Sequence, residues 1–454
     1  MNRRHLLKAS AGFAVLGLAA PRAAFGQEAL FRSIRGSINA EEFGVRPGAA
    51  DDQRDAFARM LERASAENMP IFLPPGNYIV SDIDLPPRVR LFGVAGASRI
   101  VNGGGALLSG REIEHLTLAG LVLDGAHAAL AGEVKALLDL RGAEHVAISD
   151  CTVLDSGGSA IRLERAAGRV ERTDVSHAAD IGIHSIDATG IAIDGNSVSD
   201  CGNGGILVHR WQAGSDGSMV TNNRVRRVRA ENGGTGQHGN GINVYLAHDV
   251  AVTGNHIADC AFSAIRSNSG SNVLIGGNHC LRSGETAIYS EFSFEGAVIE
   301  GNIVDGAANG ISIVNFNEGG RMATCTGNIV RNLTTEGPYE PSPPGFGCGI
   351  SVEADSTVTG NVIENAPAWA MQIGWGPFLR NVIATGNVIR KAGLGIGVSV
   401  VEGSGSALIT DNIIEGAERG AIVGHRWAEA VTRDLALQEE SGFAHLTVRG
   451  NRAG

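Results

Sequence analysis

The stretch "DGNSVSDCGNGGILVHRW", residues 194–211, returns with small changes along most of the chain. Related stretches are "TGNHIADCAFSAIRSNSG" at 253–270 and "EGNIVDGAANGISIVNF" at 300–316. Each begins with a Gly-Asn pair, continues with a short β-branched segment, and reaches a Gly-Ile or Ala-Ile pair about ten residues after the Asn. Successive isoleucines are mostly 21 to 26 residues apart. A period of this length indicates a solenoid, and the alternating segments indicate short strands.

The repeat predicts an all-β fold, a right-handed parallel β-helix with three short strands per coil. Helical periodicity is absent from this region, as is the leucine-and-asparagine signature of leucine-rich repeats. The recurring asparagines are Asn196, Asn223, Asn255, Asn278, Asn302, Asn328, Asn361, Asn387, Asn412 and Asn451. Asn tolerates the left-handed backbone of a tight bend, and stacked amides can hydrogen-bond along the axis. We therefore expect a structural Asn ladder and not a binding site.

A different pattern precedes the repeats, in residues 38–94. Asp51 or Asp52 can cap a helix over 53–66, and "PIFLPPGNYIV" predicts a strand with a Pro-Pro-Gly turn. This order resembles the N-terminal segment of the pectate-lyase-like superfamily, in which a helix and a hairpin cap the open end of the solenoid. Without such a cap, the first coil would expose apolar interior and an unpaired edge.

The first residues predict export. "NRRHLLK" at 2–8 resembles a twin-arginine signal, and the apolar run 13–20 is too short to span a bilayer. We expect a signal peptide at 1–26, a cap at 27–100 and β-helix repeats at 101–454, with the protein periplasmic or secreted and not membrane-bound after processing. The mature chain would have 33 Lys and Arg against 48 Asp and Glu, a formal charge of −15, which argues against nucleic acid as a partner.

The signal, the cap and the Gly-Asn repeats together resemble a family of twin-arginine-translocated repeat proteins with the pectate-lyase-like fold. The resemblance covers nearly the whole chain. It implies the fold and export, and it carries over no catalytic residues. The function must therefore be argued from the residues themselves.

The six cysteines do not form a zinc pattern. Cys201 and Cys260 occupy equivalent places two coils apart, which puts their Cα atoms about 9.6 Å apart, too far for a disulfide. They are expected to be small buried apolar side chains, and the pairing of Cys348 is left open. The sequence contains no metal-binding motif, and calcium remains open as a cofactor.

The strands that begin at the repeated isoleucines carry the sharpest functional signal. The Ile and the residue two later should point inward, and the residues one and three later outward. In the early and middle coils, the outward positions hold ionisable or aromatic residues, whereas in the late coils they are mostly small. Insertions at 212–219, 230–240 and 334–347 flank these coils and predict the walls of a cleft.

This pattern predicts a carbohydrate-active protein acting on a polysaccharide, of the lyase or epimerase type on a glycan that contains uronic acid. The predicted catalytic residues are His209, Tyr245, Arg266 and Glu291. The predicted substrate-binding residues are His184, Asn243, Asn268, Tyr289, Trp211 and His238. A cation is needed to neutralise the carboxylate, and a base to take the proton beside it.

Two alternatives stay open. One is a glycan-binding or structural solenoid without catalysis, in which Trp211, Trp375 and Trp427 offer platforms for sugars or plug the ends of coils. The other is a glycoside hydrolase using Glu291 and Glu353, two rungs apart. The partner is a polysaccharide or oligosaccharide in each case except a purely structural solenoid, and the oligomeric state is left open.

Export should depend on the arginine pair. Replacing Arg3 and Arg4 with Lys keeps the charge but removes the residues that twin-arginine signals require. We expect unprocessed precursor in the cytoplasm, detected by fractionation and immunoblotting. Normal processing ahead of Gln27 in that variant would point instead to the general secretory route.

Overall fold

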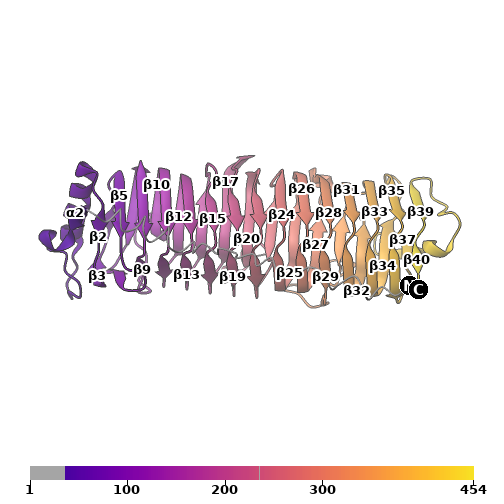
Figure 1. The fold of residues 1–454 in the computed structure, drawn as a ribbon. Helices are drawn as coiled ribbons and strands as arrows, with labels where there is room; N and C mark the ends of the chain where they lie inside the picture. The colour runs from indigo at the N-terminus through magenta and orange to yellow at the C-terminus, as the bar shows by residue number, and fades with distance from the viewer. Residues whose placement is uncertain (1–35, 235) are drawn as a thin grey trace, which may run out of the picture.

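The computed structural model describes residues 36–454 except residue 235, and it is a right-handed parallel β-solenoid of about 14 turns (Figure 1). The expected fold is therefore confirmed. Each coil runs through three parallel sheets, which we call sheets 1, 2 and 3 in the order in which the chain crosses them. The signal sequence expected at residues 1–26 lies outside the described residues.

Sheet 1 contains the repeated isoleucines. Its strands are β4 (Ile83–Asp84), β7 (Leu108–Ile113), β10 (Ala136–Ser149), β12 (Ser159–Glu171), β14 (Ile181–Ile186), β17 (Gly204–Ser215), β20 (Asn240–His248), β23 (Ile265–Asn268), β25 (His279–Glu291), β27 (Ile303–Ile313), β30 (Ile350–Val352), β32 (Val362–Ile373), β34 (Val388–Ser399) and β37 (Ile422–Arg426). The long strands bend around a corner: β10 and β12 continue into sheet 2, and β25, β27, β32 and β34 begin in sheet 3.

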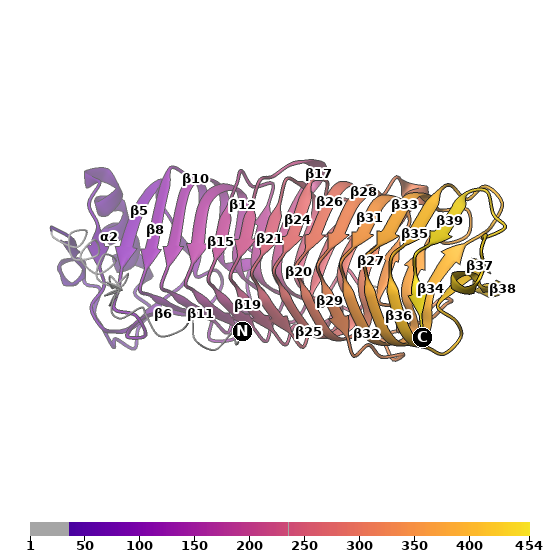
Figure 2. The same cartoon turned by 45° about the vertical axis from the view of Figure 1, so that its right-hand side comes forward.

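The other two sheets complete each coil (Figure 2). Sheet 2 contains β1 (Ile38–Asn39), β2 (Ile71–Phe72), β5 (Arg88–Phe92), β8 (His115–Ala119), β15 (Ala192–Asp194), β18 (Met219–Thr221), β21 (Ala251–Thr253), β24 (Val273–Gly276), β26 (Glu295–Glu300), β28 (Arg321–Thr326), β31 (Ala354–Thr359), β33 (Arg380–Thr385), β35 (Ala407–Thr410) and β39 (Leu446–Arg449). Sheet 3 contains β3 (Gly76–Val80), β6 (Ser98–Asn102), β9 (Val122–Asp124), β11 (Thr152–Leu154), β13 (Asp174–Ser176), β16 (Ser197–Ser199), β19 (Arg224–Arg226), β22 (His256–Ala258), β29 (Ile329–Arg331), β36 (Ile413–Ala417) and β40 (Arg452–Ala453).

The N-terminal end is covered by α2 (Arg54–Glu67) beside the short helix η1 (Ala40–Phe43). Helix α2 starts one residue later than expected, its Arg54 amide donates to Asp52 Oδ1 at 2.9 Å, and its apolar face is buried. The expected hairpin at Pro-Pro-Gly is wrong. β2 pairs with β1 and β5, whereas β3 pairs with β6, so this turn is a corner between two sheets. Parallel stacking already satisfies both strands, which leaves no need for an antiparallel partner.

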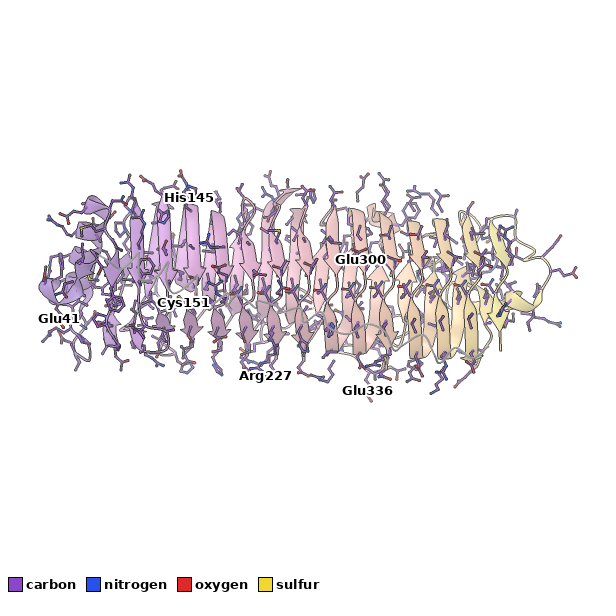
Figure 3. All side chains as sticks on the ribbon, viewed as in Figure 1. Glu41, His145, Cys151, Arg227, Glu300 and Glu336 are labelled. Carbon is purple, nitrogen blue, oxygen red and sulfur yellow. The ribbon has the colours of Figure 1, made fainter. Side chains whose placement is uncertain are left out.

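The remaining elements lie late in the chain. β38 (Glu429–Asp434) pairs antiparallel with β37, and η2 (Phe316–Glu318) and η3 (Leu435–Leu437) are single turns. The interior is one continuous apolar cluster that runs the length of the solenoid. All six cysteines are free and buried, including Cys151, which lies within the coil in Figure 3, and Cys348.

The Asn ladder is present at the corner between sheets 2 and 3 and runs from Asn196 to Asn451. Asn302 illustrates the pattern: its Nδ2 donates to Ile275 O and to Asn328 Oδ1, both at 3.0 Å. Its Oδ1 accepts from the backbone N and Nδ2 of Asn278, at 2.9 and 3.0 Å. Each buried amide therefore satisfies polar groups on both neighbouring coils, which fixes the stacking register.

Replacing Asn302 with Leu should destabilise the solenoid. The substitution leaves buried donors and acceptors on two coils unpaired, and each such loss costs about 1–3 kcal/mol. A thermal unfolding curve measures the effect. Asn77→Leu, at an exposed strand position of the cap, is the matched control and should melt like the wild type. Equal melting of both variants would contradict the ladder's structural role.

Candidate functional site

The outer face of sheet 1 has the register expected from the repeats. Asn243 lies opposite Leu207 on one side and Arg266 on the other. In the neighbouring column, Tyr245 lies opposite His209, and Asn268 opposite Glu291. Strand pairing thus brings side chains from successive coils to one patch, with rungs about 4.8 Å apart.

A cleft of about 480 Å³ lies on this patch. Its lining includes eight of the predicted residues: His184, His209, Trp211, His238, Asn243, Tyr245, Arg266 and Asn268. Gln237 and His238 come from the insertion at 230–240, Trp211 lies in the later part of β17, and Phe292 directly follows β25. This volume lies within the range of ordinary ligand sites.

Two imidazoles form one side of the cleft. His184 Nε2 lies 3.2 Å from His209 Nδ1, and the Tyr245 ring centroid lies 5.6 Å from that of His209. Burial lowers the pKa of His209 to about 4 and lowers the pKa of His184 well below its usual value. Both rings are therefore neutral near pH 7.

The buried polar atoms that lack a partner among the described residues include His209 Nε2 and Asn243 Oδ1 in the cleft. Buried polar atoms in proteins are nearly always hydrogen-bonded. Because both residues line the cleft, these atoms are suited to bind a polar group of a ligand.

Arg266 on the floor forms an ion pair with Glu291, and two of the predicted residues, Glu291 and Tyr289, do not themselves line the cleft. Arg266 Nε donates to Glu291 Oε1 at 2.5 Å, and Asn268 Nδ2 donates to the same oxygen at 3.2 Å. The side chains of Arg266 and Glu291 are only 11% and 7% exposed. Burial raises the pKa of Glu291, although the Arg266 charge opposes this shift. Arg266 is thus held by the Glu291 carboxylate. Tyr289 lies beside it, with the guanidinium carbon 5.9 Å from its ring centroid.

The sequence did not point to Glu285, which lies next to this pair. Tyr339, from the insertion at 334–347, donates from its hydroxyl to Glu285 Oε1 at 2.5 Å. Burial raises the pKa of Glu285. Glu285 precedes the outward columns of sheet 1, and its partner is 54 residues away, so no local pattern could have revealed it.

The insertion at 230–240 passes directly over Arg266. A Cβ on Gly236 would lie 2.4 Å from Arg266 Nη1 and 3.4 Å from Glu285 Oε2, so a larger residue there would displace the Arg266 guanidinium. The backbone φ of Gly236 is +107°, which also favours glycine. Two insertions therefore converge on Arg266 and Glu285, but of the three insertions expected to wall the cleft only the one at 230–240 supplies lining residues, Gln237 and His238.

Three other candidates lie outside the cleft. Glu353 lies two rungs from Glu291, with Val314 on the rung between them. Its carboxylate accepts a hydrogen bond from the Phe316 amide at 2.7 Å, and burial raises the pKa of Glu353 to about 7. Trp375 and Trp427 pack against each other at the C-terminal end, with ring centroids 5.8 Å apart. Neither the second carboxylate of a hydrolase nor these indoles reach the cleft.

No group of three or more His, Cys, Asp or Glu side chains within the described residues is placed to hold a metal ion. Over the same part of the chain, no helix is long and apolar enough to cross a membrane.

A family model, "Right handed beta helix region", matches residues 137–214 and 209–383, which together are more than half of the chain. The chain belongs to this right-handed β-helix family. No curated protein sequence matches it significantly.

Several solved structures have a similar fold. The N-terminal fragment of gene product 12 of bacteriophage Phi29 matches with a TM-score of 0.51 and 14% identity, over 95% of this chain and 74% of that one. An α-1,3-glucanase catalytic unit from Streptomyces thermodiastaticus matches with a TM-score of 0.47 and 14% identity, over 92% of this chain and 69% of that one. PfbA, a surface adhesin of Streptococcus pneumoniae, matches with a TM-score of 0.48 and 12% identity, over 91% of this chain and 100% of that one. At such identity the likeness shows the fold alone, and a fold by itself does not determine a function.

The depressed pKa of His209 predicts a pH dependence of stability. Above about pH 6.5 the imidazole is neutral in both states. Between pH 6.5 and about 4 the unfolded chain binds a proton that the folded protein does not, so acidification through this window destabilises the fold. The loss amounts to as much as about 3 kcal/mol.

His209→Gln removes this contribution, so its stability relative to the wild type should rise as the pH falls from 6.5 to 4. Unfolding midpoints measured across that range test the prediction. His279→Gln, at an exposed position on sheet 3, is the control and should follow the wild type. A constant difference between His209→Gln and the wild type would contradict the neutral buried imidazole.

Proposed function

We propose that this chain is an exported carbohydrate-active protein that binds a polysaccharide containing uronic acid in the cleft of sheet 1. There it removes the proton beside the sugar carboxylate, as lyases and epimerases do. The observation that carries the proposal is the placement of neutral His209 beside Tyr245 and within one cleft with Arg266. A base, a second proton-transfer group and a cation are what this chemistry requires.

The lining of the cleft suits a sugar chain. Trp211, Phe292 and Tyr245 are 68%, 38% and 41% exposed, and such rings stack on the apolar faces of sugars. The amides of Asn243 and Asn268 line the same cleft and can bond hydroxyl or carboxylate oxygens. An aromatic rim around neutral polar groups therefore supports a carbohydrate ligand.

In the proposed reaction, Arg266 and the two amides bind the carboxylate and withdraw charge from the adjacent carbon. His209 takes the C5 proton, and the bound anionic substrate raises the pKa of that imidazole toward the range of a general base. In elimination, the C4–O bond breaks, a C4–C5 double bond forms, and Tyr245 protonates the leaving oxygen. In epimerisation, Tyr245 returns a proton to the opposite face of C5. Glu291 acts as a positioning residue for Arg266.

Glycan binding without catalysis is the second candidate, and the exposed rim at Trp211 favours it. The hydrolase alternative has less support, because Glu291 is committed to Arg266 and Glu353 to the Phe316 amide. Export by the twin-arginine route and membership of the twin-arginine-translocated repeat family are part of the same proposal. A periplasmic or secreted location would bring the protein to polysaccharides outside the cytoplasm.

Tyr245→Phe is the sharpest test. Arg266→Ala would leave Glu291 buried without its partner, at a cost of about 3–5 kcal/mol, so lost activity could reflect lost folding. Tyr245 is 41% exposed, and Phe keeps its ring, so the variant should melt like the wild type. The wild type is screened on uronic-acid and neutral polysaccharides for unsaturated products, new reducing ends and inverted C5. On the substrate found, Tyr245→Phe should lower turnover at least about a hundredfold.

His279→Gln, on sheet 3 away from the cleft, should retain full turnover. Wild-type turnover in both Tyr245→Phe and His209→Gln would overturn the assignment of these residues. Binding of a polysaccharide without any product would establish the second candidate. Absence of both binding and turnover on every polysaccharide would refute the proposed function.

A further inference from the structure

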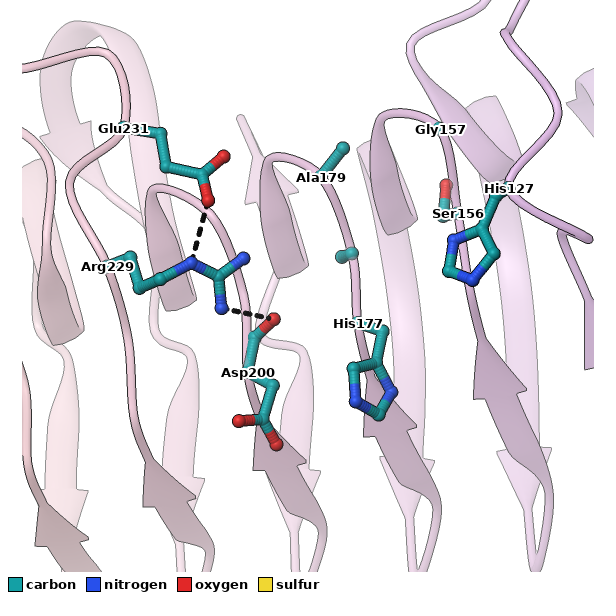
Figure 4. Close-up of a pocket in the computed structure, with 9 residues that line it drawn as sticks. His127, Ser156, Gly157, His177, Ala179, Asp200, Arg229 and Glu231 are labelled. Carbon is teal, nitrogen blue, oxygen red and sulfur yellow. Dashed lines mark hydrogen bonds and ion pairs between the residues drawn. The ribbon is translucent and has the colours of Figure 1, made fainter.

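A second depression lies on the corner between sheets 3 and 1. The insertions at 125–135 and 230–240 project from this corner, and the three coils between them have short turns at 155–158, 177–180 and 200–203. The gap, which we call the notch, encloses about 370 Å³. Figure 4 shows Arg229 and Glu231 at one end of the notch and His127 at the other, with His177 and Asp200 on the turns between.

The floor of the notch is flat because its turns hold very small residues. A Cβ on Gly157 would lie 2.2 Å from Ala128 O, and a Cβ on Gly202 would lie 2.1 Å from Ala179 O. Close stacking of the turns therefore demands glycine at these two positions. The strands β10 and β20 that bound the notch are four rungs apart, about 19 Å, which leaves room for sugar rings.

The walls of the notch carry polar side chains, among them positively and negatively charged ones. His127 Nε2 and His177 Nδ1 lie 3.4 and 3.7 Å from one oxygen of Asp155. Arg229 donates from Nε to Glu231 at 2.7 Å and from Nη1 to the backbone oxygen of Asp200 at 3.1 Å. Imidazole, carboxylate and guanidinium groups are the donors and acceptors that bind sugar hydroxyls. The imidazoles are more than half exposed and thus accessible.

The notch adjoins the cleft. Ala178 and Ala179 line the notch, and Ile181, two residues later on β14, lines the cleft. The insertion at 230–240 borders both, since Glu231 faces the notch and His238 the cleft. A chain leaving the cleft past Ile181 would cross the corner and enter the notch.

The geometry points to a second sugar subsite in the notch, which binds the continuation of the same polysaccharide chain held in the cleft. This inference rests on the proposed function, and it adds that the protein recognises a segment longer than the cleft alone can hold. The glycan then turns across the corner between the two insertions. Arg229 and His177 are the residues that bind it there.

The test compares affinities for oligosaccharides of graded length. Two ladders serve as probes, alginate oligosaccharides and oligogalacturonides, each from disaccharide to octasaccharide. Binding is measured by calorimetry in a Tyr245→Phe background, to prevent turnover. Arg229→Ala and His177→Ala should each raise the Kd of the octasaccharide about tenfold and leave that of the shortest bound oligosaccharide unchanged.

Arg282→Ala is the matched control. Arg282 lies on the same corner beyond the insertion, is 61% exposed and pairs with Asp259, as Arg229 pairs with Glu231. The control should bind every length like the parent protein. Because Arg229 and His177 lie on different coils, the same loss of affinity in both variants cannot come from one local change of structure. Melting curves are recorded for each variant to confirm that it folds.

Three outcomes would overturn the subsite. Unchanged affinity at all lengths in both variants would refute it while leaving the cleft assignment intact. An equal loss at every length would show that the residues act through the fold and not by contact. If neither ladder binds the parent protein at any length, both the subsite and the uronate proposal are wrong.

Discussion

Stacking of the coils is held in register by the buried asparagine amides. Each amide bonds the coil before and the coil after, as at Asn302, so a coil cannot slip without leaving several buried polar groups unpaired. A slip of one residue in any strand would also turn its interior isoleucines outward. The ladder and the alternation thus impose the same register, and every side-chain position on the outer faces follows from it.

The outer face of sheet 1 shows what this register achieves. His209, Tyr245 and Arg266 belong to three successive coils, yet the pairing places them within one cleft. The floor residues His209, Tyr245 and Arg266 lie on paired strands and not on loops. The insertion at 230–240 supplies part of its wall. The insertion at 334–347 reaches Glu285 through Tyr339, and its Glu336 projects from the same edge as Arg227 in Figure 3.

Charge is distributed unevenly around the cleft. On the floor, Arg266 and Glu291 neutralise each other, and burial keeps the two histidines uncharged. In the notch, by contrast, charged side chains face solvent. Such an arrangement places the weakly solvated groups in the cleft, where we propose the reaction, and the well-solvated ones in the notch, where we propose that the glycan continues. Electrostatic interactions in the cleft are therefore stronger than those in the notch.

The sequence alone determined the repeat and its consequences. Periodic isoleucines and asparagines predicted the solenoid, the inward and outward residues, and the columns that carry His209 and Tyr245, because strand alternation and coil stacking are local rules. The tertiary structure decided the contacts between distant segments, which those local rules cannot predict. The ion pair of Arg266 and Glu291, the bond from Tyr339 to Glu285, and the corner in place of a hairpin at Pro-Pro-Gly all depend on which segments meet in space. Insertions have no repeat to fix their course, so only packing against the coils shows where they lie.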